Sequence, residues 1–221
     1  DPLIDERICL YKAGRSEHFS KAIEKEVKSY GDSIDKSFYP KRLDLTHLDF
    51  ITIDPKSAKD FDDAIYYDKA EHTLYVAIAD VTAYVHPHMA VDDEARKRGF
   101  TIYFPHKSIP MLPRALSENL CSLMPHVDRL AYVFKMTLNQ STNAIRKFEL
   151  FEAIINSKRR FNYDEIDVLF ETNQAKDDAK YFDFLKPLSH ITQKWRTQRL
   201  SEGFDFDNGE QQLVLDENLL L

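Results

Sequence analysis

Six short apolar runs between residues 50 and 156 constrain the fold of this chain more than any other feature of its sequence. Each run is rich in β-branched or aromatic residues, which is typical of strands. The runs are FITI (50–53), AIYYD (64–68), LYVAIAD (74–80), FTIYF (100–104), LAYVFKMTL (130–138) and FELFEAIIN (148–156). The sequence therefore predicts a β-rich block in the middle of the chain.

Helical patterns stand before, within and after this block. They are SKAIEKEVKSY (20–30, ended by Gly31), AVDDEARKRG (90–99, closed by Gly99), YDEIDVLFE (163–171) and one or two helices in 176–202, interrupted at Pro187. The last segment, 204–221, is expected to form a strand or a hairpin. This order of elements predicts an α+β fold, a mixed β-sheet core flanked by helices, and not an alternating α/β fold.

Composition limits the classes of protein to which the chain can belong. Its 221 residues, 43% of them hydrophobic, suffice for one large domain or a domain with an attached piece. No apolar run approaches the roughly 18–20 residues that span a bilayer. Two distant cysteines, Cys9 and Cys121, and no leader segment predict a cytoplasmic protein without a membrane partner. The net charge of −7 argues mildly against nucleic acid, although bound divalent cations would change the charge of an acidic site.

Four aspartates fall within ten residues of the stretch TIDPKSAKDFDDAIYY (52–67): Asp54, Asp60, Asp62 and Asp63. Apolar runs precede and follow them, so the loop that carries them starts and ends in the core. One reading is an acidic surface loop. Another is a magnesium site, since Mg²⁺ prefers oxygen ligands, and two ions about 3.5–4 Å apart can clamp the reacting oxygens of a phosphoryl displacement. The spacing alone leaves both readings open.

A calcium loop of the EF-hand type is a third reading, and the spacing excludes it. Such a loop needs Gly at its sixth position and Glu at its twelfth. Counted from Asp54, these positions hold Lys59 and Ile65.

The segment TIDPKSAKDFDDA resembles the metal-binding signature of the ribonuclease II/ribonuclease R family of exoribonucleases. The resemblance continues through LYVAIADVTAYV (74–85), through residues 101–138 with their PMLP and LCSL motifs, and through INSKRRFNYDEI (155–166). It covers nearly all of residues 43–221, and the ribonuclease R branch is the nearer one. The resemblance implies a partial ribonuclease II-type catalytic domain.

The family resemblance implies magnesium-dependent, hydrolytic degradation of single-stranded RNA from its 3′ end, with release of nucleoside 5′-monophosphates. By the same resemblance, Asp54, Asp60 and Asp63 hold magnesium or its waters, and Asp62, also in the metal set, is the position most critical for cleavage. The chemistry agrees, because phosphodiester hydrolysis needs charge stabilisation and an activated water but no special nucleophilic side chain.

Three aromatic residues are implied to contact RNA. Tyr103 matches the clamp that stacks on the 3′-terminal base, although a tyrosine in FTIYF is ordinarily a core residue. Tyr163 matches the residue that contacts the ribose and its 2′-hydroxyl, against a plain surface tyrosine at a helix start. Phe206 is the candidate for the second clamp residue, with Phe204 as the alternative.

Other polar residues are interpreted as parts of the fold or as possible RNA contacts. Asp80 is expected to form hydrogen bonds at a strand end, and Ser117 to be a helix N-cap. The basic run Lys158–Arg160 is read either as a phosphate contact or as a solvated turn.

Residues 1–42 are expected to form a lead-in strand, helix and connector from an upstream barrel, and 43–221 the N-terminal two-thirds of the catalytic domain. The family resemblance implies partners in the parent chain: downstream catalytic helices and flanking cold-shock and S1-type barrels. The rival to an exoribonuclease fragment is a catalytically silent RNA-binding module on the same scaffold. The intact aspartate set favours the enzyme.

Overall fold

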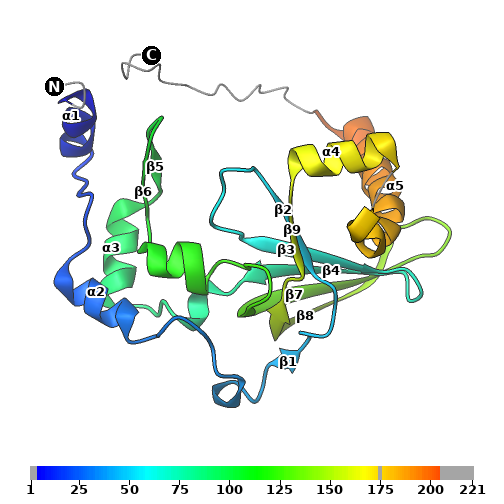
Figure 1. Ribbon diagram of the computed structural model, residues 1–221, viewed down its shortest axis with the longest axis horizontal. Helices are drawn as coiled ribbons and strands as arrows, with labels where there is room; N and C mark the ends of the chain where they lie inside the picture. The colour runs from blue at the N-terminus through cyan, green and yellow to red at the C-terminus, as the bar shows by residue number, and fades with distance from the viewer. Residues whose placement is uncertain (1–3, 174–175, 205–221) are drawn as a thin grey trace.

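The computed structural model describes residues 4–173 and 176–204 (Figure 1). Its centre is a mixed sheet with the strand order β1-β8-β7-β4-β3-β2-β9. The strands are β1 (Leu43–Asp44), β2 (Ile51–Asp54), β3 (Asp63–Asp68), β4 (Thr73–Ala79), β7 (Asp128–Leu138), β8 (Ile145–Asn156) and β9 (Arg159–Asn162). The inner strands pair antiparallel, whereas β1 on β8 and β9 on β2 are parallel. A separate two-stranded ribbon is made by β5 (Ile102–Tyr103) and β6 (Ser108–Ile109).

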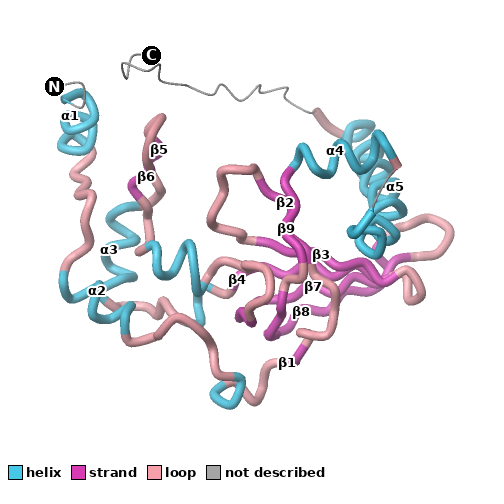
Figure 2. The backbone as a smooth tube through the Cα atoms, in the orientation of Figure 1, coloured by secondary structure: helices cyan, strands magenta, loops and turns pink. Residues whose placement is uncertain are grey.

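Helices flank the sheet at one face and at one end (Figure 2). They are α1 (Ile4–Lys12), α2 (Lys21–Lys28), α3 (Ala90–Arg98), α4 (Tyr163–Thr172) and α5 (Ala179–Glu202), with the short turns η1 (Lys36–Phe38), η2 (Val81–Ala83), η3 (Leu116–Leu120) and η4 (Lys176–Asp178). The predicted α+β fold, a mixed sheet with flanking helices, is confirmed.

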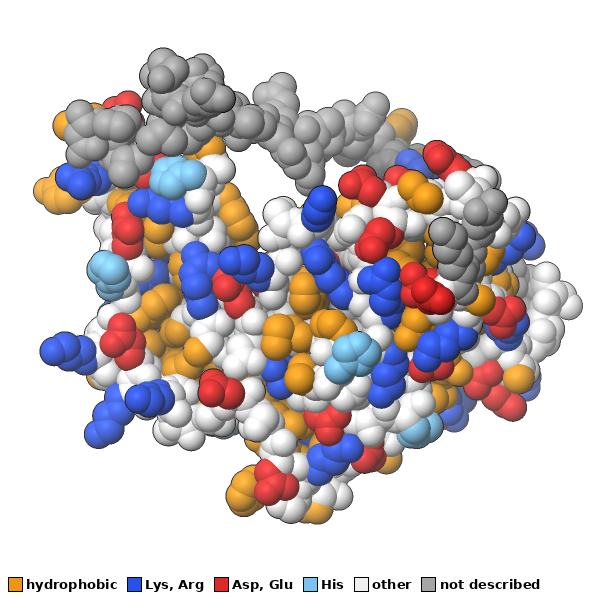
Figure 3. Space-filling model, viewed as in Figure 1, with side chains coloured by type: hydrophobic (Ala, Val, Ile, Leu, Met, Phe, Trp, Pro, Cys, Tyr) orange, Lys and Arg blue, Asp and Glu red, His pale blue; other side chains and the backbone are white. Residues whose placement is uncertain are grey.

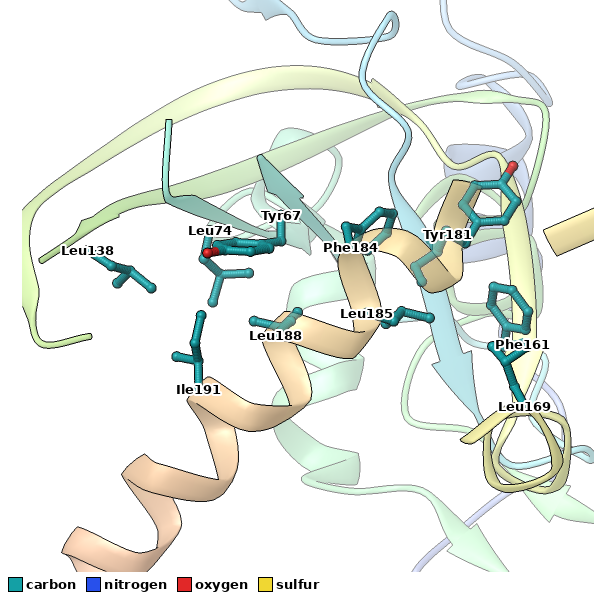
Figure 4. Close-up of a cluster of buried hydrophobic side chains, with 11 residues drawn as sticks. Tyr67, Leu74, Leu138, Phe161, Leu169, Tyr181, Phe184, Leu185, Leu188 and Ile191 are labelled. Carbon is teal, nitrogen blue, oxygen red and sulfur yellow. The ribbon is translucent and has the colours of Figure 1, made fainter. Parts of the chain in front are cut away.

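The face covered by α5 shows why the apolar runs became strands. Tyr67 and Leu74 lie opposite each other on β3 and β4, and both are buried. The α5 side chains Leu188 and Ile191 point toward them (Figure 4). Because side chains alternate across a strand, every second residue of these runs reaches this core.

The predicted break at Pro187 is wrong, since α5 runs through it without interruption. An interior proline costs a helix about 3 kcal/mol, because a hydrogen bond is lost and the ring crowds the preceding turn. The buried neighbours Phe184, Leu185, Leu188 and Ile191 each contribute about 1.5–3 kcal/mol by packing on the sheet, which outweighs that cost.

The predicted strand FTIYF does not join the main sheet. Only Ile102 and Tyr103 pair, and they pair with β6 in the separate ribbon. Pro105 follows directly and the Phe104 N–H closes a turn onto the Lys107 carbonyl at 2.8 Å, so the chain reverses before it can extend.

The predicted lead-in strand at the start of the chain is also wrong, because Ile4–Lys12 form a helix. Asp5 and Glu6 in its first turn and Lys12 in its last complement the helix dipole. The expected strand or hairpin at 204–221 lies, apart from Phe204, outside the described residues. Within the described ranges, no helix is long and apolar enough to cross a membrane.

Candidate functional site

The aspartate loop, residues 54–63, joins two neighbouring strands of the sheet. Asp54 is the last residue of β2 and Asp63 is the first residue of β3, and these strands pair antiparallel. The two ends of the loop are therefore fixed by the sheet, while the intervening residues project toward the β5–β6 ribbon (Figure 1).

The basic run after β8 braces this loop. Arg160 donates to the carbonyls of Pro55 and Lys56 at 2.8 and 2.9 Å, and its guanidinium lies 5.1 Å from the centre of the Phe61 ring. Arg159 pairs with Asp178 and Glu165, and Lys158 donates to the Thr46 carbonyl at 2.7 Å. The side chains of the run thus make internal contacts and are not a solvated turn.

A cavity of about 750 Å³ separates the loop from the ribbon. Asp54, Asp60 and Asp62 line it from the loop. The opposite lining includes the aromatic and basic residues Tyr103, Phe104, His106, Lys107 and Arg114, and also Glu118, which pairs with Arg114. Figure 3 shows Lys and Arg side chains on both sides of the hollow between the ribbon and the sheet domain. The cavity therefore has the loop carboxylates on one wall, and cations, π-faces and one further carboxylate on the other.

No sequence pattern predicted the basic side of this cavity. Lys107 is held by Glu17 at 2.9 Å and by Glu6 at 3.3 Å, and Arg114 donates to the Ser108 carbonyl at 2.8 Å. Both residues lie inside the segment 101–138 that carries the family resemblance, but no spacing rule singled them out.

Burial and mutual repulsion act on the carboxylates of the loop. Burial raises the pKa of Asp54; the neighbouring Thr52 and Arg160 side chains oppose this shift, while the charges of Asp63 and Asp62 add to it. Burial also raises the pKa of Asp62, helped by Asp60 and Asp63, and burial alone raises the pKa of Asp63. Asp62 and Asp63 remain open to solvent, so these shifts reflect displaced water and not complete enclosure. None of these aspartates is in an ion pair within the described part of the chain.

A divalent cation fits the chemistry of this loop. The buried Oδ2 of Asp54 has no hydrogen-bond partner in residues 4–173 and 176–204. A bound cation would be coordinated by this oxygen and would offset the repulsion between the carboxylates of the loop. In the same ranges, no three His, Cys, Asp or Glu side chains are already gathered closely enough to hold an ion. Three of the predicted ligands share the cavity and Asp63 does not line it, so coordination of one ion by all four stays a prediction.

The metal-free protein should gain stability from Asp54→Asn at neutral pH. The raised pKa means that native Asp54 binds more protons than the unfolded chain just above pH 4, so the free energy of unfolding falls as the pH rises through that pKa. An uncharged amide removes this dependence. We expect a higher Tm than wild type at pH 7 in EDTA, with the difference vanishing near pH 3. Equal Tm values for both proteins at pH 7 would contradict a raised pKa of Asp54.

The three aromatic candidates differ in position. Tyr103 is 74% exposed and lines the cavity, so the alternative of a core tyrosine is wrong. Tyr163 is 55% exposed and follows Asn162, which pairs with Asp54 across β9 and β2. Phe206 lies outside the described residues, while the alternative Phe204 is 96% exposed.

Two of the structural readings have clear outcomes. The Asp80 carboxylate accepts from the Ala83 N–H and the Thr82 hydroxyl at the end of β4, as predicted for a strand-end residue. Ser117 is not an N-cap, because it lies inside η3, where it lines the cavity.

The family model of the RNB domain matches residues 42–220 of the chain. The chain belongs to the RNB-domain family. Ribonuclease R of Helicobacter pylori strain J99 is 40% identical over 217 residues, which are 98% of this chain and 33% of that protein. The resemblance to the ribonuclease II/ribonuclease R family is thereby confirmed.

Solved structures of RNB-family relatives share the fold. Mycoplasma genitalium RNase R in complex with ribose methylated single-stranded RNA matches with a TM-score of 0.89 and 33% identity, over 99% of this chain and 35% of that one. The same enzyme in complex with double-stranded RNA matches with a TM-score of 0.88, over 99% of this chain and 40% of that one. The present RNB chain spans about a third of the length of the curated relatives it matches.

Proposed function

We propose that this chain carries the magnesium-binding part of a hydrolytic exoribonuclease that degrades single-stranded RNA from its 3′ end to nucleoside 5′-monophosphates. The observation that carries the proposal is the shared cavity, in which Asp54, Asp60 and Asp62 face Tyr103. A phosphodiesterase that accepts every base needs both features: oxygen ligands beside the phosphate and a π-face for the terminal base.

Each group has a distinct task in this proposal. Asp54, Asp60 and Asp63 bind magnesium directly or through water, and Asp62 completes the charge balance on which cleavage depends. Magnesium, when bound, supplies charge stabilisation of the phosphate and an activated water. Tyr103 stacks on the terminal base, and Tyr163, beside the end of β2 that carries Asp54, contacts the ribose. Mycoplasma genitalium RNase R has been solved in complex with single-stranded and with double-stranded RNA, which supports an RNA substrate here.

The second candidate function is a catalytically silent RNA-binding module on the same scaffold. It would keep the aromatic and basic side of the cavity and need no carboxylates. All four aspartates of the signature are present in this chain, and that observation favours the enzyme.

The function is tested with a 5′-labelled single-stranded RNA and, in parallel, an RNA labelled at its 3′ end. We expect magnesium-dependent release of nucleoside 5′-monophosphates, with loss of the 3′ label first and no reaction in EDTA. Tight RNA binding without any released nucleotide, at every magnesium concentration, would support the silent module.

Tyr103→Ala should change the length of the final product more than the rate of the first cleavages. Loss of one base stack removes about 1–3 kcal/mol of binding, which matters most when only a few nucleotides remain to hold the substrate. We expect a longer residual oligonucleotide on a sequencing gel, with the initial rate on long RNA only modestly lowered.

Tyr163→Ala is the matched tyrosine variant. A ribose contact discriminates RNA from DNA through the 2′-hydroxyl, so this change should narrow the preference for RNA and leave product length unchanged. The same gel, run with matched RNA and DNA oligonucleotides, separates the two roles. Identical product ladders for wild type and Tyr103→Ala would remove the stacking assignment.

A further inference from the structure

Ser122 of the LCSL motif is a fully buried residue whose hydroxyl contacts the backbone of the aspartate loop. The hydroxyl accepts from the Phe61 N–H at 3.0 Å and donates to the Lys59 carbonyl at 3.0 Å. These two hydrogen bonds lie on either side of Asp60. The next residue, Leu123, donates its N–H to the Phe61 carbonyl at 2.8 Å, directly before Asp62.

Ser122 is itself held from the sheet. Arg129 on β7 is buried, and its Nε lies 2.9 Å from the Asn119 carbonyl and 3.1 Å from the Ser122 carbonyl. From the other side, the Ala79 N–H donates to the Asp62 carbonyl at 2.8 Å. The backbone from Lys59 to Asp62 is therefore fixed by a continuous set of hydrogen bonds that leads back to β7 and β4.

The loop needs such support because its charges repel one another. Asp60 and Asp62 flank Phe61, whose ring is buried in the core while both carboxylates line the cavity. Fixing the backbone at Lys59 and Phe61 leaves the two carboxylates little freedom to turn apart. Loss of a partner that orients a metal ligand typically lowers metal affinity by about 10–100-fold.

We propose that Ser122 is a positioning residue that sets the separation of the Asp60 and Asp62 carboxylates and thereby the metal affinity of the loop. It touches neither substrate nor metal and acts only through the two backbone hydrogen bonds. The inference rests on the proposed function, since it concerns the metal that this function requires.

Ser157 provides a matched control. It is as buried as Ser122, but its hydroxyl has no hydrogen-bond partner in the described part of the chain. Ser157→Ala removes the same atom as Ser122→Ala without removing a contact to the loop.

The test measures Mn²⁺ binding by electron paramagnetic resonance and hydrogen exchange at the Phe61 amide, in wild type, Ser122→Ala, Ser122→Cys and Ser157→Ala. For Ser122→Ala we expect a Kd for Mn²⁺ raised about tenfold, and faster exchange at Phe61. Ser122→Cys, which fills the site with a slightly larger and more weakly hydrogen-bonding group, should fall between it and wild type, and it serves if the alanine variant does not fold. Ser157→Ala should match wild type.

The magnesium concentration for half-maximal RNA cleavage should rise with the Kd for Mn²⁺. Unchanged Mn²⁺ affinity in Ser122→Ala, or an equal loss in Ser157→Ala, would overturn the positioning role. If wild type cleaves no RNA, the proposed function fails, while Mn²⁺ binding and Phe61 exchange still decide the role of Ser122.

Discussion

Asp62→Asn is expected to lower turnover on single-stranded RNA by about 100-fold, the upper end of the loss that is typical when a partner of a metal ligand is removed, while RNA binding stays close to wild type. The substitution preserves size and removes one charge from the wall of the cavity that carries Asp54 and Asp60. It therefore acts on transition-state stabilisation and leaves the aromatic and basic wall intact. Single-turnover cleavage and equilibrium binding, measured with the same labelled RNA, separate the two effects.

Asp167→Asn is the matched control for this prediction. Asp167 is an exposed residue of α4 and does not line the cavity. The same chemical change there should therefore leave both the turnover and the RNA binding unaltered. Near-normal turnover in Asp62→Asn would refute the role given to Asp62 in cleavage.

Asp80→Ala should lower the free energy of unfolding by about 3–5 kcal/mol, the usual cost of removing one partner from a buried ion pair. Asp80 lies 2.5 Å from Arg42, and their side chains are only 1% and 7% exposed. The pair fastens the connector before β1 to the end of β4. Loss of the carboxylate leaves the buried Arg42 guanidinium with only the longer contact to Glu152 at 3.9 Å. It also removes the hydrogen bonds that begin η2.

Asp49→Ala tests whether this effect comes from burial. Asp49 pairs with Lys180 at 2.9 Å, but the two side chains are 40% and 56% exposed, and exposed pairs contribute little. Urea unfolding should show a large shift of the midpoint for Asp80→Ala and almost none for Asp49→Ala. Similar midpoints for the two variants would mean that the Arg42–Asp80 pair does not fasten the connector.

The regular parts of the fold follow from the sequence where local pattern and packing agree. The strands that carry Tyr67 and Leu74 are continuously apolar runs, as expected where core residues pack on both faces. The helix that ends at Gly99 has its glycine at φ 74°. Pro187 shows the limit of local rules, because the burial of its neighbours on the sheet decides the outcome. The edge strand β9 was missed because Arg159 and Arg160 lie in a polar sequence, and only pairing with β2 makes it a strand.

The candidate site divides in the same way. The aspartates could be found from the sequence because their spacing and the family resemblance fall in one short segment. The opposite wall could not, since Lys107 and Arg114 reach the cavity only through the fold of the β5–β6 ribbon and η3. Ser122 belongs to the LCSL motif of the family resemblance, but its role depends on hydrogen bonds to residues 59–61, far away in the sequence.

A crystal structure of the Asp62→Asn protein with Mn²⁺ and a short single-stranded RNA would show directly whether the cavity holds both metal and substrate. We expect anomalous density in the cavity, with Asp54 and Asp60 oxygens and an RNA phosphate as ligands, at distances close to the roughly 2.0–2.1 Å typical of Mg²⁺, and the terminal base stacked on Tyr103. Ordered RNA elsewhere on the surface, with no metal density in the cavity and the carboxylates of the loop directed into solvent, would contradict it.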